Sequence, residues 1–150
     1  MDTEAARAIV DANSYMTLAT ADADGAPWAS PVWFAHDQYE TFFWMSQPGA
    51  RHSRNIAARR EIAIVIFDST VPPHRRNAVY VEGTAAIVPN AELAAAVAVY
   101  AARSVARGLE TLAGHEVSGD APWRLYRALA SAVYVLEDEH DCRVAVQLAP

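Results

Sequence analysis

The N-terminal third of the chain alternates strand-like runs with short turn signals, and this pattern most constrains the fold. Residues 15–20 (YMTLAT) and 28–34 (WASPVWF) are rich in the β-branched and aromatic residues that suit a pleated surface. The turn-forming sequence Asp-Ala-Asp-Gly at 22–25 separates them, and its glycine can adopt a positive φ. Polar residues 37–40 then precede a third run, 41–46. Strands joined by such short turns predict an antiparallel meander.

A short helix and two further strands are expected next. Residues 50–60 have helical spacing with Ile56 directed inward, and the apolar run 61–67 predicts a strand buried on both faces. Residues 78–88 predict a fifth strand, in which Gly83 indicates a bulge.

The remaining segments complete a mainly β pattern. Helical spacing is present at 3–13 and 91–109, and residues 123–137 and 142–148 predict the last two strands. We therefore expect one domain, residues 1–150, with six or seven mostly antiparallel strands in a closed or partly closed β-barrel and with flanking helices. Closure of the barrel would remove exposed strand edges.

Composition excludes several classes of function. The chain has 18 acidic and 12 basic residues and a net charge of −6, which argues against nonspecific binding to nucleic acid or anionic membranes. The first residues, MDTEAARAIVDA, lack a basic region, and no apolar run approaches the ~20 residues of a membrane span. A lone cysteine, Cys142, cannot form an intrachain disulfide and is expected to be a small buried side chain. We expect a cytoplasmic protein without a metal site, since the histidines are scattered.

A basic turn interrupts this acidic chain in the sequence WMSQPGARHSRNI, residues 44–56. A helix that begins after Pro-Gly exposes N–H groups that can bind an anion. Ser46 supplies a hydroxyl, and Arg51, His52 and Arg54 supply cationic donors suited to phosphate. The alternative is a solvated helix face that balances Glu61 and nearby acids.

The strand PWASPVWF forms a second cluster. Pro31 lacks an N–H donor, so this strand is expected at an edge or beside a bulge, with Trp33 and Phe34 on opposite faces. Unpaired backbone groups beside an aromatic surface suit a planar heteroaromatic ligand. Ordinary packing of aromatic residues inside a barrel is the alternative interpretation.

Together, these clusters resemble the flavin-binding split-barrel family that includes pyridoxamine 5′-phosphate oxidase. The similarity rests on MTLATADADGAPWASPVWF, FFWMSQPGARHSRNIAARREIAIVIF and AVYVEGTA, in that order. It covers residues 13–88 and, more loosely, 120–150. The resemblance implies an FMN-binding homodimer with FMN at the subunit interface, acting as an oxidoreductase on a small organic molecule.

The resemblance also implies a phosphate site. Ser46 matches a hydroxyl position there, and Arg51 matches the arginine that grips the phosphate. His52 stands where a lysine is typical, and Ser30 stands where the oxidase has another phosphate-binding arginine. Both departures remove positive charge, which Arg54 would offset.

The flavin ring would be held by residues from other segments. Pro31, Val32 and Trp33 match the strand whose backbone lies against the isoalloxazine ring. Met45 stands where a tyrosine is common, and Asn77 lies near the polar position at the pyrimidine edge.

A C-terminal segment, WRLYR, is similar to the oxidase's substrate-contacting R-L-H segment, with a tyrosine at the histidine position. Trp123 and Arg127 would border the flavin, or else pack in a strand at the dimer seam. The sequence assigns no catalytic acid or base.

Two alternatives remain open on the same fold. The deazaflavin F420 has a long acidic tail, for which a basic groove could be formed by Arg54, Arg59, Arg60, Arg75 and Arg76. The chain could also be a non-catalytic flavin- or haem-binding protein. The His74-Arg75-Arg76 segment could close over a phosphate or be a solvated loop.

Overall fold

The computed structural model describes residues 1–72, 77–136 and 142–150. Over these residues, eight strands are formed: β1 Tyr15–Ala21, β2 Pro27–Trp33, β3 Ala35–Asp37, β4 Thr41–Ser46, β5 Glu61–Phe67, β6 Ala78–Ile87, β7 Arg124–Leu136 and β8 Arg143–Ala145. The helices are α1 Thr3–Ala12, α2 Arg51–Ala58 and α3 Leu93–Ala106, with short 3-10 helices η1 Asn90–Glu92 and η2 Gly114–Val117. No helix in the described part of the chain is long and apolar enough to cross a membrane.

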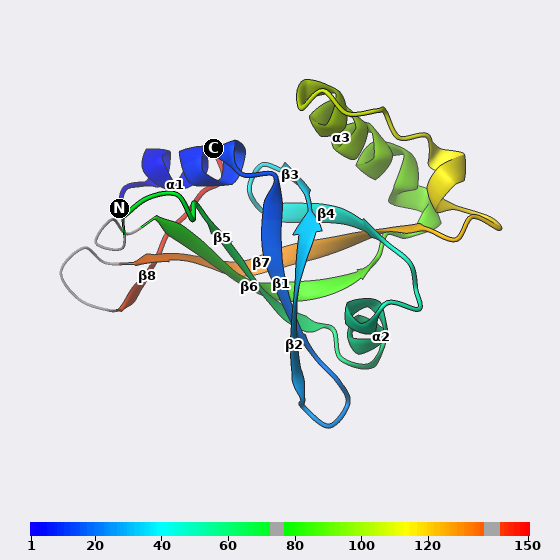
Figure 1. Ribbon diagram of the computed structural model, residues 1–150, viewed down its shortest axis with the longest axis horizontal. Coiled ribbons are helices and arrows are strands. Elements are labelled where there is room, and N and C mark those ends of the chain that lie inside the picture. The colour runs from blue at the N-terminus through cyan, green and yellow to red at the C-terminus, as the bar shows by residue number, and fades with distance from the viewer. Residues whose placement is uncertain (73–76, 137–141) are drawn as a thin grey trace.

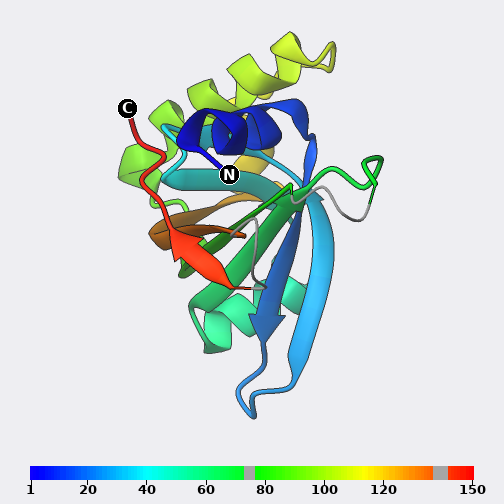
Figure 2. The ribbon, with the colours of Figure 1, turned by 90° about the vertical axis from the view of Figure 1, so that its left-hand side faces the viewer.

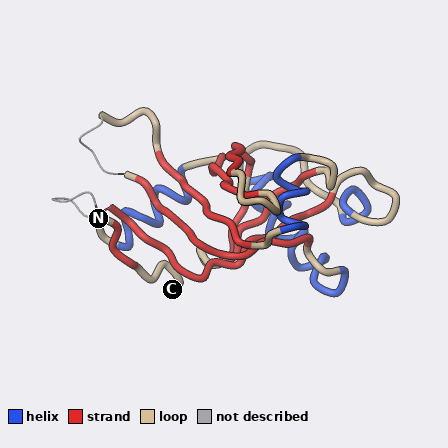
Figure 3. Tube along the Cα trace, turned by 90° about the horizontal axis from the view of Figure 1, so that it is seen from below, coloured by secondary structure: helices blue, strands red, loops and turns tan. Residues whose placement is uncertain are grey.

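The strands form one antiparallel sheet in the order β2-β1-β5-β6-β7-β4-β3, and β8 pairs with β7. Figure 1 shows the sheet curling around its inner face, and Figure 3 shows the strands from below as a curved band. The expected mainly β, antiparallel split-barrel fold is confirmed. The short strand β3 is additional to the expected strands, and β2 lies at an edge, as Pro31 predicts.

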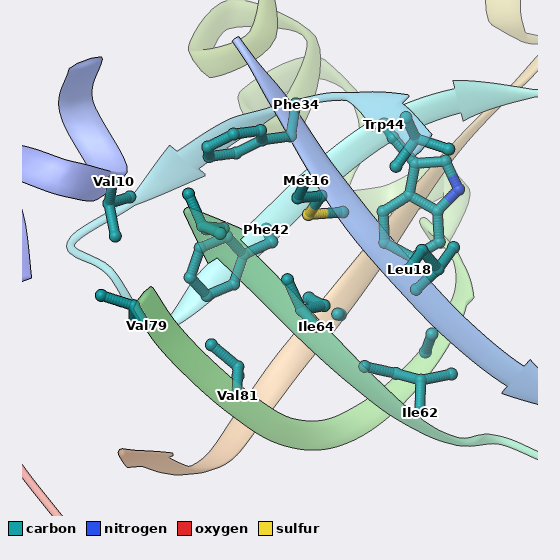
Figure 4. Close-up of a cluster of buried hydrophobic side chains, with 14 of the residues drawn as sticks. Val10, Met16, Leu18, Phe34, Phe42, Trp44, Ile62, Ile64, Val79 and Val81 are labelled. Carbon is teal, nitrogen blue, oxygen red and sulfur yellow. The ribbon is translucent and has the colours of Figure 1, made fainter. Parts of the chain in front are cut away.

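The core lies on the inner face of the curled sheet. Every second residue of β1 and β5 points inward, including Met16, Leu18, Ile62 and Ile64, and Figure 4 shows these side chains meeting Phe34, Phe42, Val79 and Val81. The expectation that residues 61–67 are buried on both faces is wrong, because only alternate residues of β5 are buried. An antiparallel sheet needs one covered face, and an apolar run alone does not reveal which residues face outward.

A bulge lies between β6 and β7, as Gly83 predicts. The register of the two strands shifts between Glu82 and Gly83. A Cβ atom added at Gly83 would lie 2.2 Å from the carbonyl oxygen of Leu129, so only glycine allows this close approach of two backbones.

Helices lie toward two ends of the molecule: α1 and α3 toward one, α2 toward the other (Figures 1 and 2). The helix expected at 91–109 is divided into η1 and α3 and ends at Ala106. Its buried residues form a second apolar cluster with β4 and β7, which includes Val97 and Tyr100.

Polar contacts connect α1 with α3 and with the β3–β4 hairpin. The guanidinium of Arg103 donates to the carbonyl oxygens of Asp11 and Asn13 at 3.0 and 3.1 Å, where the end of α1 leaves carbonyls without helical partners. The Asp11 carboxylate accepts a 2.8 Å hydrogen bond from the Tyr39 hydroxyl and lies 2.9 Å from His36 Nε2. Tyr39 has a φ of 62°, and these contacts hold it in that conformation.

Two further expectations have different outcomes. Cys142 is exposed, so the expectation of a buried cysteine is wrong; it lies beside the strand end at β8 rather than on an inward-facing position. The His74-Arg75-Arg76 segment and most of the strand connection at 137–141 lie outside the described residues.

Candidate functional site

A cavity of about 520 Å³ lies between β2, β4, α2 and α3. Seven of the residues expected to bind the cofactor line it: Pro31, Val32, Trp33, Met45, Ser46, His52 and Trp123. Gln47, Gly49, Ala50 and Tyr100 complete the lining. The volume is within the range of roughly 300–1,000 Å³ that is usual for small-molecule sites.

Strand pairing brings these distant segments together. Ser46, at the end of β4, pairs with Arg124, which directly follows Trp123 in the chain. The strand β2 forms one edge of the sheet. Phe34, the residue after β2, is buried in the core, whereas Trp33 faces the opposite side, toward α3. The predicted opposite orientation of these two rings is therefore confirmed.

A group of hydroxyls and one imidazole forms the end of the cavity at α2. Ser46 Oγ lies 2.7 Å from His52 Nε2 and 2.9 Å from Ser53 Oγ, and both serines are buried. Burial lowers the pKa of His52 below its ordinary value of 6.5, so the imidazole is neutral near neutral pH. Ala50 provides no side-chain cap for α2, which leaves the first N–H groups of the helix available to an acceptor.

The arginines of α2 lie outside the lining. The guanidinium carbon of Arg51 is 4.2 Å from the centre of the exposed Trp28 ring, a cation–π contact. Arg54 donates a hydrogen bond to the carbonyl oxygen of Gly49, which does line the cavity. Both side chains are exposed beside the helix start, and neither lines the cavity.

Three other expected site residues do not line the cavity. Ser30 is half-buried in β2 and pairs with Leu18. Asn77 precedes β6, whose opposite end at Ile87 lies beside Tyr126 in β7, near the cavity. Arg127 donates two hydrogen bonds to the Glu92 carboxylate, at 2.9 and 3.1 Å.

Sequence reasoning missed Tyr100, which lines the cavity from α3 and packs edge-on against Trp33 with ring centres 5.0 Å apart. Burial raises the pKa of Tyr100 to about 12. An aromatic residue at a helical position normally indicates core packing, and nothing local in the sequence distinguishes Tyr100 from such a residue.

The described lining is uncharged near neutral pH. None of its residues is Asp, Glu, Lys or Arg, and His52 and Tyr100 are both neutral there. Side chains of described residues also form no cluster of His, Cys, Asp and Glu that could hold a metal ion. The geometry therefore suits an organic ligand with a large apolar part and an anionic group near the start of α2.

Comparison with known families agrees with this geometry. The family profile described as pyridoxamine 5′-phosphate oxidase matches residues 2–136. The chain belongs to the pyridoxamine 5′-phosphate oxidase family. The match spans the strands and helices around the cavity, from α1 to the end of β7. No curated protein sequence matches the chain significantly.

Solved structures of similar fold have different functions. A haem-binding protein from Mycobacterium smegmatis matches with a TM-score of 0.75 and 22% identity over 97% of this chain, which spans 57% of that protein's length. The haem storage protein HutZ from Vibrio cholerae matches with a TM-score of 0.65 and 22% identity, covering 86% of this chain and 90% of that one. An F420 reductase is 26% identical, with a TM-score of 0.55 over 79% of this chain and 87% of its own. At 22% identity, the two haem-associated structures show only that the fold is shared.

Proposed function

We propose that this chain is a homodimeric flavoprotein that binds FMN in the cavity and transfers hydride or electrons to a small organic molecule. The observation that carries the proposal is the meeting of Pro31–Trp33, Ser46 and His52 around one cavity in a member of this family. FMN supplies the redox chemistry when bound, and the protein supplies binding and orientation.

The phosphate end fits an anion through neutral donors. The N–H groups at the start of α2, together with Ser46, Ser53 and His52, face the same region, and the helix terminus favours negative charge. Arg51 and Arg54 lie beside the helix start, where they add positive charge. A bound phosphate would raise the pKa of His52, because an imidazolium ion is stabilised by a nearby anion.

The ring end fits a flat heteroaromatic group. Pro31 and its neighbours belong to an edge strand, so their outward backbone groups are available for hydrogen bonds. Met45 adds apolar surface beside that ring, and Trp33 and Trp123 would border its substrate side.

The outer face of the sheet supports a homodimer. Tyr15 is 61% exposed and Phe67 is 48% exposed, and both lie on the side of β1 and β5 that faces away from the core. A shallow hollow of about 550 Å³ on this face is lined by small residues that include Ala19 and Ala63 and by the charged residues Arg59, Glu61 and Glu82. A second copy would cover the exposed apolar side chains of this face, and sedimentation velocity should show a dimer that Ala63→Arg converts to a monomer.

F420 is the second candidate cofactor, because an F420 reductase is among the similar structures. Arg54 and Arg60 are exposed near α2, whereas Arg59 donates to the carbonyl oxygens of Asp22 and Ala23 in the β1–β2 turn. Arg75 and Arg76 lie outside the described residues, so the basic groove expected for F420 stays a prediction. Haem binding without catalysis is the remaining alternative, because two of the similar structures are of haem-associated proteins.

Titration of the cofactor-free protein with FMN, F420 and haem tests the proposal. We expect FMN to bind most tightly and Arg51→Ala to weaken FMN binding by roughly 10- to 100-fold, the value of a charged hydrogen-bonded contact. Arg60→Ala is the matched control, since Arg60 is exposed beyond the end of α2, and it should change FMN affinity less than twofold.

Riboflavin, which lacks the phosphate, should bind equally to the wild type and to Arg51→Ala. Preference for F420 would keep the site and replace the cofactor. Equal FMN affinity of Arg51→Ala and wild type would show that the basic turn is a solvated helix start, and the phosphate grip would be refuted.

A further inference from the structure

The cavity lining includes three aromatic side chains, Trp33, Tyr100 and Trp123, and the thioether of Met45; we call these four residues the aromatic end. Trp33 and Tyr100 meet at an interplanar angle of 66°, which fixes both rings and leaves their remaining surface to the cavity. Trp123 is 41% exposed, so its ring is accessible from outside. None of these side chains takes part in the hydroxyl and imidazole group at α2.

The Tyr100 hydroxyl is a polar group at this end, in addition to the indole N–H groups of Trp33 and Trp123. The residue is only 8% exposed, and its hydroxyl forms no hydrogen bond with any described residue. The hydroxyl oxygen is not among the buried polar atoms of the described residues that lack a hydrogen-bond partner, so solvent reaches it. An acceptor atom on a bound ligand would provide that partner.

The position of Tyr100 is set by α3 rather than by the ligand. Its neighbours Ala96 and Val97 are buried in the second apolar cluster, and Arg103, one turn further along, attaches α3 to the end of α1. The phenol is thus held at the cavity wall before any ligand arrives, which reduces the entropy lost on binding.

Charge narrows the class of ligand. The described lining carries no charged side chain near neutral pH, and the chain as a whole is acidic. A charged group placed against the aromatic end would lose its hydration without gaining an ion pair. An uncharged ring loses little hydration and gains contact with the three aromatic side chains.

We infer that the aromatic end binds an uncharged, planar substrate ring and that the Tyr100 hydroxyl donates a hydrogen bond to an acceptor atom on that ring. The inference rests on the proposed function, because it names the class of substrate for the same cavity. Tyr100 is thereby the residue that distinguishes rings with an acceptor from plain hydrocarbons of the same shape.

Two probes of matched shape test this assignment on the FMN-loaded protein: quinoline, which has a ring nitrogen acceptor and is uncharged near neutral pH, and naphthalene, which has none. Ligand-observed NMR titration gives both affinities. We expect Tyr100→Phe to weaken quinoline binding by roughly 3- to 10-fold, the value of one neutral hydrogen bond, and to change naphthalene binding less than twofold. The unchanged naphthalene affinity also shows that the variant is folded.

Tyr39→Phe is the matched control, because it also removes one tyrosine hydroxyl, here bonded to Asp11, and Tyr39 does not line the cavity. It should leave both affinities unchanged. Equal effects of Tyr100→Phe on the two probes, or no quinoline binding at all, would overturn the assignment. Tighter binding of the anion quinoline-2-carboxylate than of quinoline would overturn the uncharged class.

A failure of the proposed function can be distinguished from a failure of the Tyr100 assignment. If FMN does not bind, the flavin proposal fails, and the same probes are titrated into the chain without cofactor. A selective loss of quinoline affinity in Tyr100→Phe then still supports the aromatic end as a binding site, and its absence refutes it.

Discussion

We expect Gly83→Ala to lower the free energy of unfolding by about 2–3 kcal/mol, because its methyl group has no room in the β6–β7 bulge. The new Cβ would lie 2.2 Å from the carbonyl oxygen of Leu129 and 3.3 Å from the Cα of Ala130. The first distance is more than 1 Å short of ordinary van der Waals contact, and both partners are backbone atoms that no rotamer change can move. Two central strands must therefore separate locally.

Urea denaturation measures this cost, and the m-value should stay unchanged if only the folded state is affected. For a chain of this length, the loss corresponds to a fall in Tm of roughly 4–12 °C. Gly114→Ala is the matched control: a Cβ there meets nothing within 4 Å and the backbone φ is not positive, so its stability should be unchanged or slightly raised. Indistinguishable midpoints for the two variants would refute the packing argument at the bulge.

Three further predictions concern charge. Burial lowers the pKa of His36 and of His52, so the unfolded chain binds protons more readily than the folded chain. The stability that is present above about pH 6.5 should therefore fall as the pH drops through the folded pKa values. In urea titrations at several pH values, His52→Gln should make this fall smaller. Asp11→Ala removes the acceptor of the Tyr39 hydroxyl and the partner of His36, and it should lower the free energy of unfolding by about 1–2 kcal/mol in the same assay. An unchanged midpoint would show that these contacts between α1 and the β3–β4 hairpin do not stabilise the fold. Arg127→Ala breaks an exposed ion pair with Glu92, so the free energy of unfolding should fall by less than about 1 kcal/mol. FMN affinity should change less than twofold, because Arg127 does not line the cavity. A large loss of FMN affinity would instead place Arg127 in the site.

The strands around the site were accessible to sequence reasoning because their signals are local. Turn residues at 22–25 and the β-branched and aromatic residues of β1 and β2 are recognised from nearest neighbours alone. The bulge at Gly83 was likewise foreseen, since a glycine inside a strand pattern indicates a close backbone approach. The three-residue strand β3 escaped notice because its length gives no period to detect.

The candidate site was foreseen in part, through the order of motifs rather than through contacts. Seven expected residues share one cavity, but Arg127 is paired with Glu92 and Asn77 lies at the other end of β6. The direction of a side chain at a strand end depends on register, and one residue of shift moves it to the other face.

By itself, the sequence determined the antiparallel β architecture, the turns and the basic helix start, because each depends on backbone preferences and on spacing within a few residues. Tertiary structure alone decided that Tyr100 meets Trp33, that Arg51 rests on Trp28 and that His52 is neutral. These outcomes depend on which distant surfaces come together and on how much water they exclude. A one-dimensional pattern does not contain that information, since burial and side-chain partners are properties of the packed chain.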